Sequence, residues 1–152
     1  MRLVVVDTGT LGLLTHPRAQ PTARACWQWA QSLLAAGVRI IVPGIAVYEL
    51  RRELIRAGKA LGLQRLDAIR AGFEFDPVTQ TSLDEAARLW AVVRNAGLTT
   101  AHPAALDGDA ILAAQTMLAT SAGDTATIAT DNQRHLSRFP GIDARRWQSI
   151  IC

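Results

Sequence analysis

The sequence predicts one α/β domain in which a mostly parallel central sheet is flanked by helices. The chain has 152 residues, of which 49% are hydrophobic, enough for a buried core of its own. Short runs of β-branched apolar residues recur along it, as expected of parallel strands buried on both faces. Helical patterns alternate with these runs, which favours a parallel sheet. Because no linker or repeat interrupts the pattern, we interpret residues 1–152 as a single domain.

The predicted strands are short and apolar. Residues 2–6 (RLVVV) and 38–42 (VRIIV) form the first two, and residues 125–130 (TATIAT) form a later one. Residues 73–78 (FEFDPV) alternate briefly between apolar and polar, which is consistent with a short strand. Residues 145–151 are candidates for a last edge strand.

Boundary signals define the predicted helices. Pro21 precedes one helix and Gly37 follows it. Ser82 and Glu85 form a capping box at the start of another, which Gly97 ends. The predicted helices are 22–36, 45–57, 60–71, 82–96 and 109–121, with a loop over 98–106.

The composition is mildly basic, with a formal net charge of +3. Nearly all the basic residues are arginines, which form planar bidentate contacts with phosphate, although a GC-rich genome would give the same bias. Cys26 and Cys152 lack zinc-site spacing and are predicted to be free thiols in a reducing compartment. No run resembles a signal peptide or a membrane span, so we expect a cytoplasmic protein without a membrane partner.

Four acidic residues follow predicted strands and are candidate site residues. Asp7 and Asp131 come directly after strands, Glu49 lies one turn into the next helix, and Asp109 lies at a helix start. Sites in open α/β sheets form beyond the carboxyl ends of the strands, so the four can share one rim. Each also has a local interpretation: a turn for Asp7, an N-cap for Asp109, an N-cap pair with Asn132 for Asp131, and an ion pair with Arg52 for Glu49.

Converging carboxylates point to a particular chemistry. They repel one another, and a hard divalent cation removes that repulsion. Mg²⁺ or Mn²⁺ held in this way activates water and stabilises charge on a phosphodiester. No histidine or cysteine is placed to select zinc. The prediction is metal-dependent phosphodiester hydrolysis.

Four segments in a fixed order carry a family resemblance: VVVDTGTLGLL at 4–14, IAVYELRREL at 45–54, LDGDAILAAQ at 106–115 and IATDNQRHLSRFPGI at 128–142. Together they resemble PIN-domain nucleases, in particular VapC-type toxins of bacterial toxin–antitoxin systems. The resemblance covers essentially the whole chain. It implies a PIN-like three-layer sandwich and endoribonuclease activity.

The resemblance also implies roles for individual residues. The four acids would be catalytic with Mg²⁺ or Mn²⁺, and the hydroxyls of Thr8 and Thr130 and the side chain of Asn132 would support them. Asp107 stays an outer-shell candidate for the metal: on one helix it would face away from Asp109, but in a preceding loop it could turn toward the metal. The implied acids are Asp7, Glu49, Asp109 and Asp131, with Asp7, Asp109 and Asp131 as metal ligands.

Arginines near the acids are candidate RNA contacts, since arginine binds phosphate. A solvated helix face is an equally weighted interpretation for the arginines on the 45–57 helix. The candidates are Arg51, Arg52, Arg134 and Arg138.

The leading functional prediction is a ribonuclease toxin that acts on RNA and is neutralised by a cognate antitoxin. The resemblance also implies a homodimer. Two alternatives stay open: a housekeeping PIN ribonuclease in RNA processing, and a catalytically silent PIN-like binding module.

Overall fold

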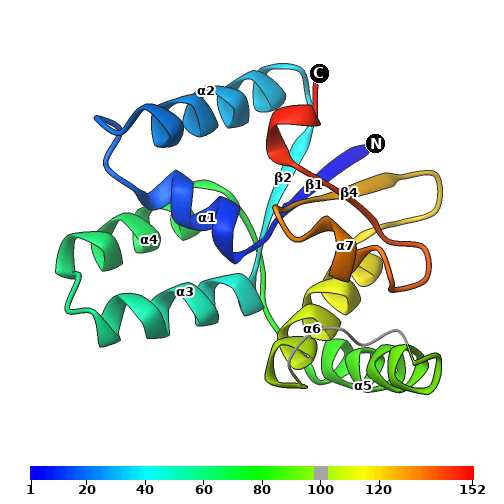
Figure 1. Cartoon of the computed structure of the whole chain (residues 1–152). Helices are drawn as coiled ribbons and strands as arrows, with labels where there is room; N and C mark the ends of the chain where they lie inside the picture. Colours follow the sequence, from blue (N-terminus) through cyan, green and yellow to red (C-terminus); the bar gives the residue numbers. More distant parts are fainter. Residues whose placement is uncertain (98–102) are drawn as a thin grey trace.

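A computed structural model, which describes residues 1–97 and 103–152, has five parallel strands in one sheet with helices on both faces (Figure 1). Every pair of neighbouring strands is parallel, in the order β3-β2-β1-β4-β5. The predicted parallel sheet is therefore confirmed. The strands are β1 (Arg2–Val6), β2 (Arg39–Pro43), β3 (Glu74–Asp76), β4 (Thr125–Ala129) and β5 (Asp143–Arg145).

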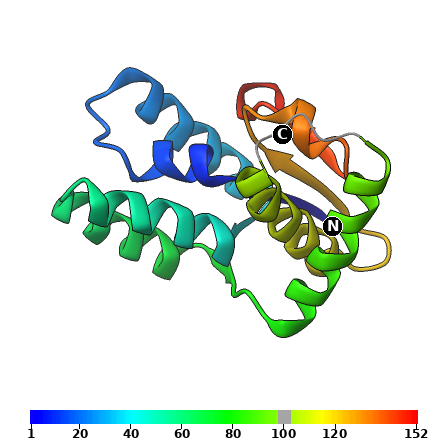
Figure 2. The same cartoon turned by 60° about the horizontal axis from the view of Figure 1, so that its bottom comes forward.

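The helices form two outer layers, which Figure 2 shows as separate groups on either side of the sheet. Side chains of α1, α2, α4 and η1, with most of the buried side chains of α3, pack on one face; those of α5, α6 and α7 pack on the other. No helix in the described part of the chain is long and apolar enough to cross a membrane. The helices are α1 (Thr8–Thr15), α2 (Pro21–Ala35), α3 (Gly44–Arg56), α4 (Ala60–Gly72), α5 (Gln80–Asn95), α6 (Pro103–Ala119), α7 (Gln133–Leu136) and the 3₁₀ helix η1 (Trp147–Ser149).

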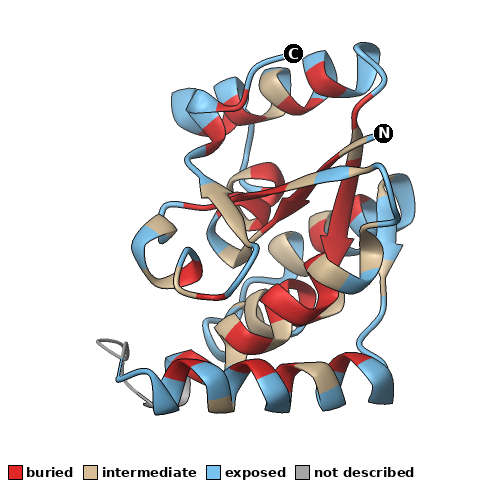
Figure 3. Ribbon diagram, turned by 90° about the vertical axis from the view of Figure 1, so that its right-hand side faces the viewer, coloured by how far each residue is buried: buried red, intermediate tan, exposed pale blue. Residues whose placement is uncertain are grey.

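The central strand explains this three-layer arrangement. Successive side chains of a strand point to opposite faces of the sheet. In β1, Val4 and Val6 belong to the core under α1 and α2, whereas Leu3 and Val5 belong to the core under α6. Figure 3 shows the corresponding burial of the inner surfaces and the exposure of the outer face of α5.

The structure differs from the predicted elements at four main places. The segment after Asp7 is the helix α1, where no helix was predicted. The start of α5 is capped by Thr79, which accepts from the backbone N–H of Ser82, so the predicted box at Ser82 lies one turn too late. The last strand ends at Arg145 and a 3₁₀ turn replaces the predicted 145–151 strand.

The fourth correction concerns α6, which begins at Pro103 instead of residue 109. Proline is favoured in the first turn of a helix, where its missing N–H is not needed. Residues 103–106 of the predicted loop are therefore helical, and residues 98–102 lie outside the described residues. Asp107 and Asp109 are consequently both inside one helix.

A buried glutamine fixes α3 against α6. Pro43, the N-cap of α3, offers no side-chain acceptor to the free N–H groups of the first turn. Gln115 of α6, only 1% exposed, fills this role because its Oε1 accepts from the N–H of Ile45 at 3.1 Å. Its Nε2 donates to the carbonyl oxygen of Asp76 at 2.7 Å and to Oδ2 at 3.0 Å. One side chain therefore ties together α6, the start of α3 and the end of β3.

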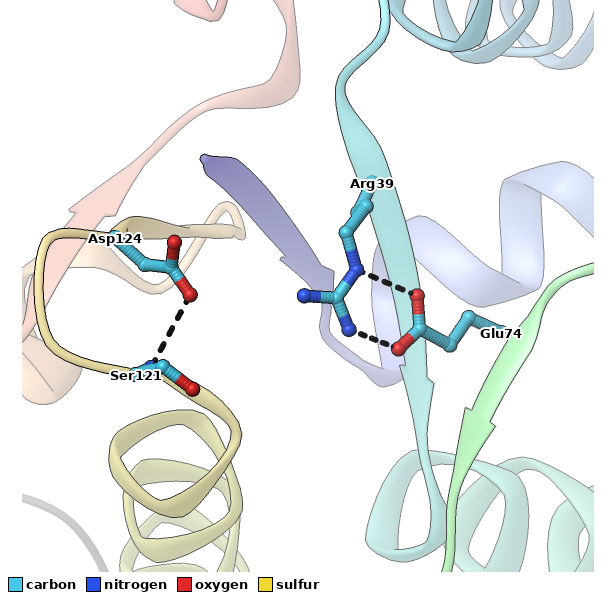
Figure 4. Close-up of polar contacts among 4 residues, drawn as sticks. All are labelled: Arg39, Glu74, Ser121 and Asp124. Atoms are coloured by element: carbon cyan, nitrogen blue, oxygen red, sulfur yellow. Dashed lines mark hydrogen bonds and ion pairs between the residues drawn. The ribbon is translucent and has the colours of Figure 1, made fainter.

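Charges at the amino ends of the strands are paired (Figure 4). Arg39 of β2 forms an ion pair with Glu74 of β3. Asp124, just before β4, accepts from the N–H of Ser121 at 3.2 Å and from the amino-terminal ammonium at 2.8 Å. At the opposite, carboxyl edge of the sheet, acidic side chains instead share one pocket.

Candidate active site

Three of the four predicted acids line one small pocket of about 180 Å³ at the carboxyl edge of the sheet. Asp7 follows β1, Glu49 is on α3 and Asp109 is on α6. Residues far apart in sequence therefore meet because of the parallel topology, as expected for an α/β site. The other lining residues are Thr8, Gly108, Leu112, Thr130, Asn132 and Leu136.

The carboxylate of Asp7 is held at the junction of β1 and α1. Its Oδ1 accepts from the N–H of Thr10 at 2.7 Å and so caps α1. The N–H of Asp7 and the hydroxyl of Thr10 both donate to the carbonyl oxygen of Ala129, at 3.1 and 2.8 Å. The local interpretation of Asp7 as a turn or cap residue is thus correct, and it is compatible with a place in the pocket.

Two side chains interact with the carboxylate of Glu49, and a glycine leaves room for it. Its Oε1 accepts from the hydroxyl of Thr8 at 2.8 Å, and its Oε2 lies 3.8 Å from the guanidinium of Arg52. A Cβ placed on Gly108 would lie 2.9 Å from Oε2, closer than real Cβ contacts. The missing side chain at Gly108 therefore leaves room for this carboxylate beside α6.

Asp109 has the electrostatics of a carboxylate crowded by others. Its pKa is raised to about 6, first by burial and then by the negative charges of Glu49 and Asp7. Asp109 lies inside α6, so the interpretation of it as an N-cap is wrong.

Asp131 lies outside the pocket wall. Its side chain is exposed, whereas the neighbouring Thr130 is fully buried and accepts from the N–H of Asn132 at 2.8 Å. Val6 pairs with Ala129, so β1 and β4 end side by side and Asp131 follows β4 close to Asp7. Burial, followed by the charges of Asp131 and Asp7, raises the pKa of the Cys26 thiol to about 12. The N-cap of α7 is Asn132, without a side-chain capping bond, so the predicted N-cap pair is confirmed at Asn132 and is wrong for Asp131.

The structure does not bring Asp107 to the pocket. Asp107 is exposed and lines a groove between α5 and α6, together with Leu83, Trp90 and Ile111. Residues two apart on a helix face different directions, and α6 already includes both acids. Asp107 was expected to reach the metal only if it lay in a loop before the helix. It lies inside α6, so this outer-shell role is not supported.

The pocket's donor atoms suit a hard cation. Carboxylate and hydroxyl oxygens line it, and none of its lining residues in the described part of the chain is a histidine or a cysteine. Within residues 1–97 and 103–152, no group of three or more acidic, histidine or cysteine side chains is arranged to hold a metal ion as it stands. A cation would therefore need small side-chain movements to bring the carboxylate oxygens together.

The candidate RNA-binding arginines have different environments. Arg51 is engaged in an ion pair with Asp67 of α4, as expected of a structural partner. Arg52 is 60% exposed beside Glu49. Arg134 on α7 is exposed and Arg138 just after it is half-buried, close in sequence to Leu136 of the pocket.

Sequence reasoning missed two residues of the site. Thr10 anchors β1 to β4, and Gly108 makes room for Glu49. A glycine directly before Asp109 was visible in LDGDA, but nothing in the sequence indicates that Glu49 packs against it.

An all-parallel five-stranded sheet between two helical layers, with acids gathered at its carboxyl edge, is the PIN-like fold. Solved structures with this fold that match the chain include a VapC toxin and VapBC complexes. A chain of VapBC2 from Rickettsia felis, bound to a promoter DNA fragment, matches with a TM-score of 0.71 and 16% identity, over 95% of this chain and 98% of that one.

Two further structures match over similar lengths. DNA-bound VapBC from Salmonella typhimurium has a TM-score of 0.62 and 22% identity, over 97% and 99% of the two chains. VapC20 from Mycobacterium tuberculosis, a sarcin-ricin loop cleaving toxin, has a TM-score of 0.61 and 16% identity, over 90% and 95%. No family model and no curated protein matches the sequence. At these identities, the structural likeness establishes the fold.

Proposed function

We propose that this chain is a metal-dependent endoribonuclease that hydrolyses RNA phosphodiester bonds at the acidic pocket. The observation that carries the proposal is that Asp7, Glu49 and Asp109 share one pocket and that their charges raise the pKa of Asp109. Carboxylates crowded in this way favour a divalent cation. The fold shared with a toxin that cleaves the sarcin-ricin loop supports RNA as the substrate.

In this proposal, Asp7 and Asp109 would hold Mg²⁺ or Mn²⁺ in the pocket, with Asp131, which lies outside its lining, as a further ligand. When bound, the cation would supply an activated water and charge stabilisation at the phosphate. The Thr8 hydroxyl orients the Glu49 carboxylate, whose Oε2 accepts a proton from the attacking water. The bonds from Thr10 to Asp7 and Ala129 keep the Asp7 carboxylate from turning away.

We also propose that the chain is the toxin of a toxin–antitoxin pair. The matching VapBC structures are complexes, which supports a protein partner. A mainly apolar groove of about 730 Å³ between α1, α3 and α4 offers a surface for it, lined by Leu50, Leu54 and Leu61 with Lys59 and Arg65. An antitoxin segment with apolar side chains and a few acids would fit this lining. The homodimer stays a prediction, which light scattering of the purified chain would test.

Cleavage of total RNA with Mn²⁺, by wild type and by Asp7→Asn and Asp109→Asn, tests the proposed activity. Both substitutions should reduce the rate by at least about 100-fold, since each removes a charge from the pocket. Asp107→Asn is the matched control, because it removes a carboxylate from the same helix but outside the pocket. Equal activity in all four proteins, or activity that survives EDTA, would refute the proposal.

A further inference from the structure

An exposed aromatic side chain stands beside the acidic pocket. Tyr48, the only tyrosine, directly precedes Glu49 on α3. Its side chain is 58% exposed, more than any other aromatic residue of the chain; Phe75 and Trp90 follow at 38% and 37%. An exposed ring next to a polar site is a candidate for contact with a ligand.

Arg52 joins this ring to the pocket. Its guanidinium carbon lies 5.2 Å from the ring centroid of Tyr48, and its Nη2 lies 3.8 Å from Oε2 of Glu49. A ring, a guanidinium and a pocket carboxylate thus follow one another along the surface of α3. The guanidinium packs against the ring by a cation–π contact and restricts its rotation, while both side chains stay largely open to solvent.

We propose that Tyr48 and Arg52 form a stacking subsite for one unpaired nucleobase of the RNA strand that the acidic pocket cleaves. This inference rests on the proposed ribonuclease function. Proteins recognise single-stranded RNA by stacking its bases on aromatic rings and guanidinium planes, and arginine also attracts the neighbouring phosphate. Tyr48 and Arg52 offer both kinds of contact next to Glu49.

The other arginine–aromatic pairs lack this connection. Trp90 and Arg94 on α5 form a similar pair, with 5.3 Å between guanidinium carbon and ring centroid, but Trp90 lines the separate groove that contains Asp107. Trp27, under Arg18, is partly buried against Phe73. Among the four pairs in the described residues, only that of Tyr48 is linked to a pocket carboxylate by an ion pair.

Two probes of equal charge separate stacking from phosphate binding. The first is a fluorescent oligoadenylate of ten nucleotides, and the second is a ten-unit chain of abasic ribose phosphates. Both are titrated into the full chain in EDTA, which prevents metal-dependent cleavage. Wild type should bind oligoadenylate more tightly than the abasic chain.

Tyr48→Ala should raise the Kd for oligoadenylate about tenfold, within the range for one stacked base, and leave the Kd for the abasic chain unchanged. Tyr48→Phe should retain wild-type binding, because the ring is kept. Trp90→Ala is the matched control and should bind both probes as wild type does.

Three results would overturn the subsite. The first is an equal loss on both probes in Tyr48→Ala, and the second is no loss at all. The third is unchanged oligoadenylate binding with a loss of self-association, which would assign Tyr48 to a protein contact. If wild type neither binds oligoadenylate nor cleaves RNA with Mn²⁺, the ribonuclease proposal fails as well; cleavage with unaffected Tyr48→Ala binding would overturn the subsite alone.

Discussion

Gly108 and Glu49 lie so close together that a Cβ added to Gly108 would be 2.9 Å from Oε2 of Glu49. The two residues come from α6 and α3, so the position of the carboxylate depends on how closely these helices approach. The Thr8 hydroxyl holds the other carboxylate oxygen at 2.8 Å. Glu49 therefore has little freedom to accept a larger neighbour without losing this bond.

Gly108→Ala should lower RNA cleavage at least about tenfold while the fold is preserved. Alanine is favoured over glycine in a helix by about 1 kcal/mol, which offsets the cost of moving Glu49. Cleavage rate and urea unfolding measured together would check this. Gly72→Ala is the control, because a Cβ there meets nothing within 4 Å; equal activity of the two variants would contradict the role of Gly108.

Thr8→Val should reduce the cleavage rate and Thr8→Ser should largely restore it. Valine keeps the shape of threonine but removes the hydroxyl that donates to Glu49, and a hydrogen bond to a charged group contributes about 1.5–3 kcal/mol. The measurement is kcat for both variants. A serine variant as inactive as the valine variant would show that the hydroxyl is not what matters.

Without metal, the free energy of unfolding should fall as pH rises from about 4 to about 6. The pKa of Asp109 is raised in the folded chain, mainly by burial, so the folded state binds more protons than the unfolded state in this window. Asp109→Asn should flatten the dependence. Urea titrations in EDTA at several pH values measure the free energy of unfolding. If it changes with pH in the same way in wild type and in Asp109→Asn, the prediction is contradicted.

Gln115→Leu should lower the free energy of unfolding by about 2 kcal/mol or more, because it leaves the buried N–H of Ile45 without its acceptor. The exposed Gln28→Leu, on α2, is the control and should change stability little. Urea unfolding compares the two. Similar stability of both variants would mean that another acceptor satisfies the start of α3.

Leu61→Glu should weaken capture of an antitoxin and leave RNA cleavage intact. Leu61 is 63% exposed in the groove between α1, α3 and α4, away from the acidic pocket. Co-purification with the product of a neighbouring antitoxin gene, together with a cleavage assay, measures both effects. Loss of RNA cleavage with retained antitoxin capture would contradict this prediction.

The sequence allowed prediction of the strands and most helices because their signals are local. The run RLVVV and the stop at Gly37 are examples. The helix α1 was missed since Gly9 and Gly12 weaken the helical signal, while the tertiary bond from Thr10 to Ala129 supports it. The start of α6 was placed late because an acid at residue 109 resembles a cap.

The acids of the pocket were predictable for a topological reason: residues after parallel strands reach one edge. Asp107 could be separated from Asp109 only with the knowledge that α6 begins at Pro103. The exposure of Asp131 was not predictable, because it depends on how the neighbouring Thr130 is buried. Contacts such as Gly108 with Glu49 join two helices through side-chain packing, which no local pattern encodes.

The central place of β1 has a consequence for the timing of assembly. β1 is synthesised before β4, with which it pairs and which begins at Thr125. The bonds that anchor the Asp7 segment end on Ala129, so this corner of the pocket cannot close until Ala129 has been made. Pairing between such distant segments slows folding. A nascent chain on the ribosome would therefore carry an incomplete pocket until β4 has emerged.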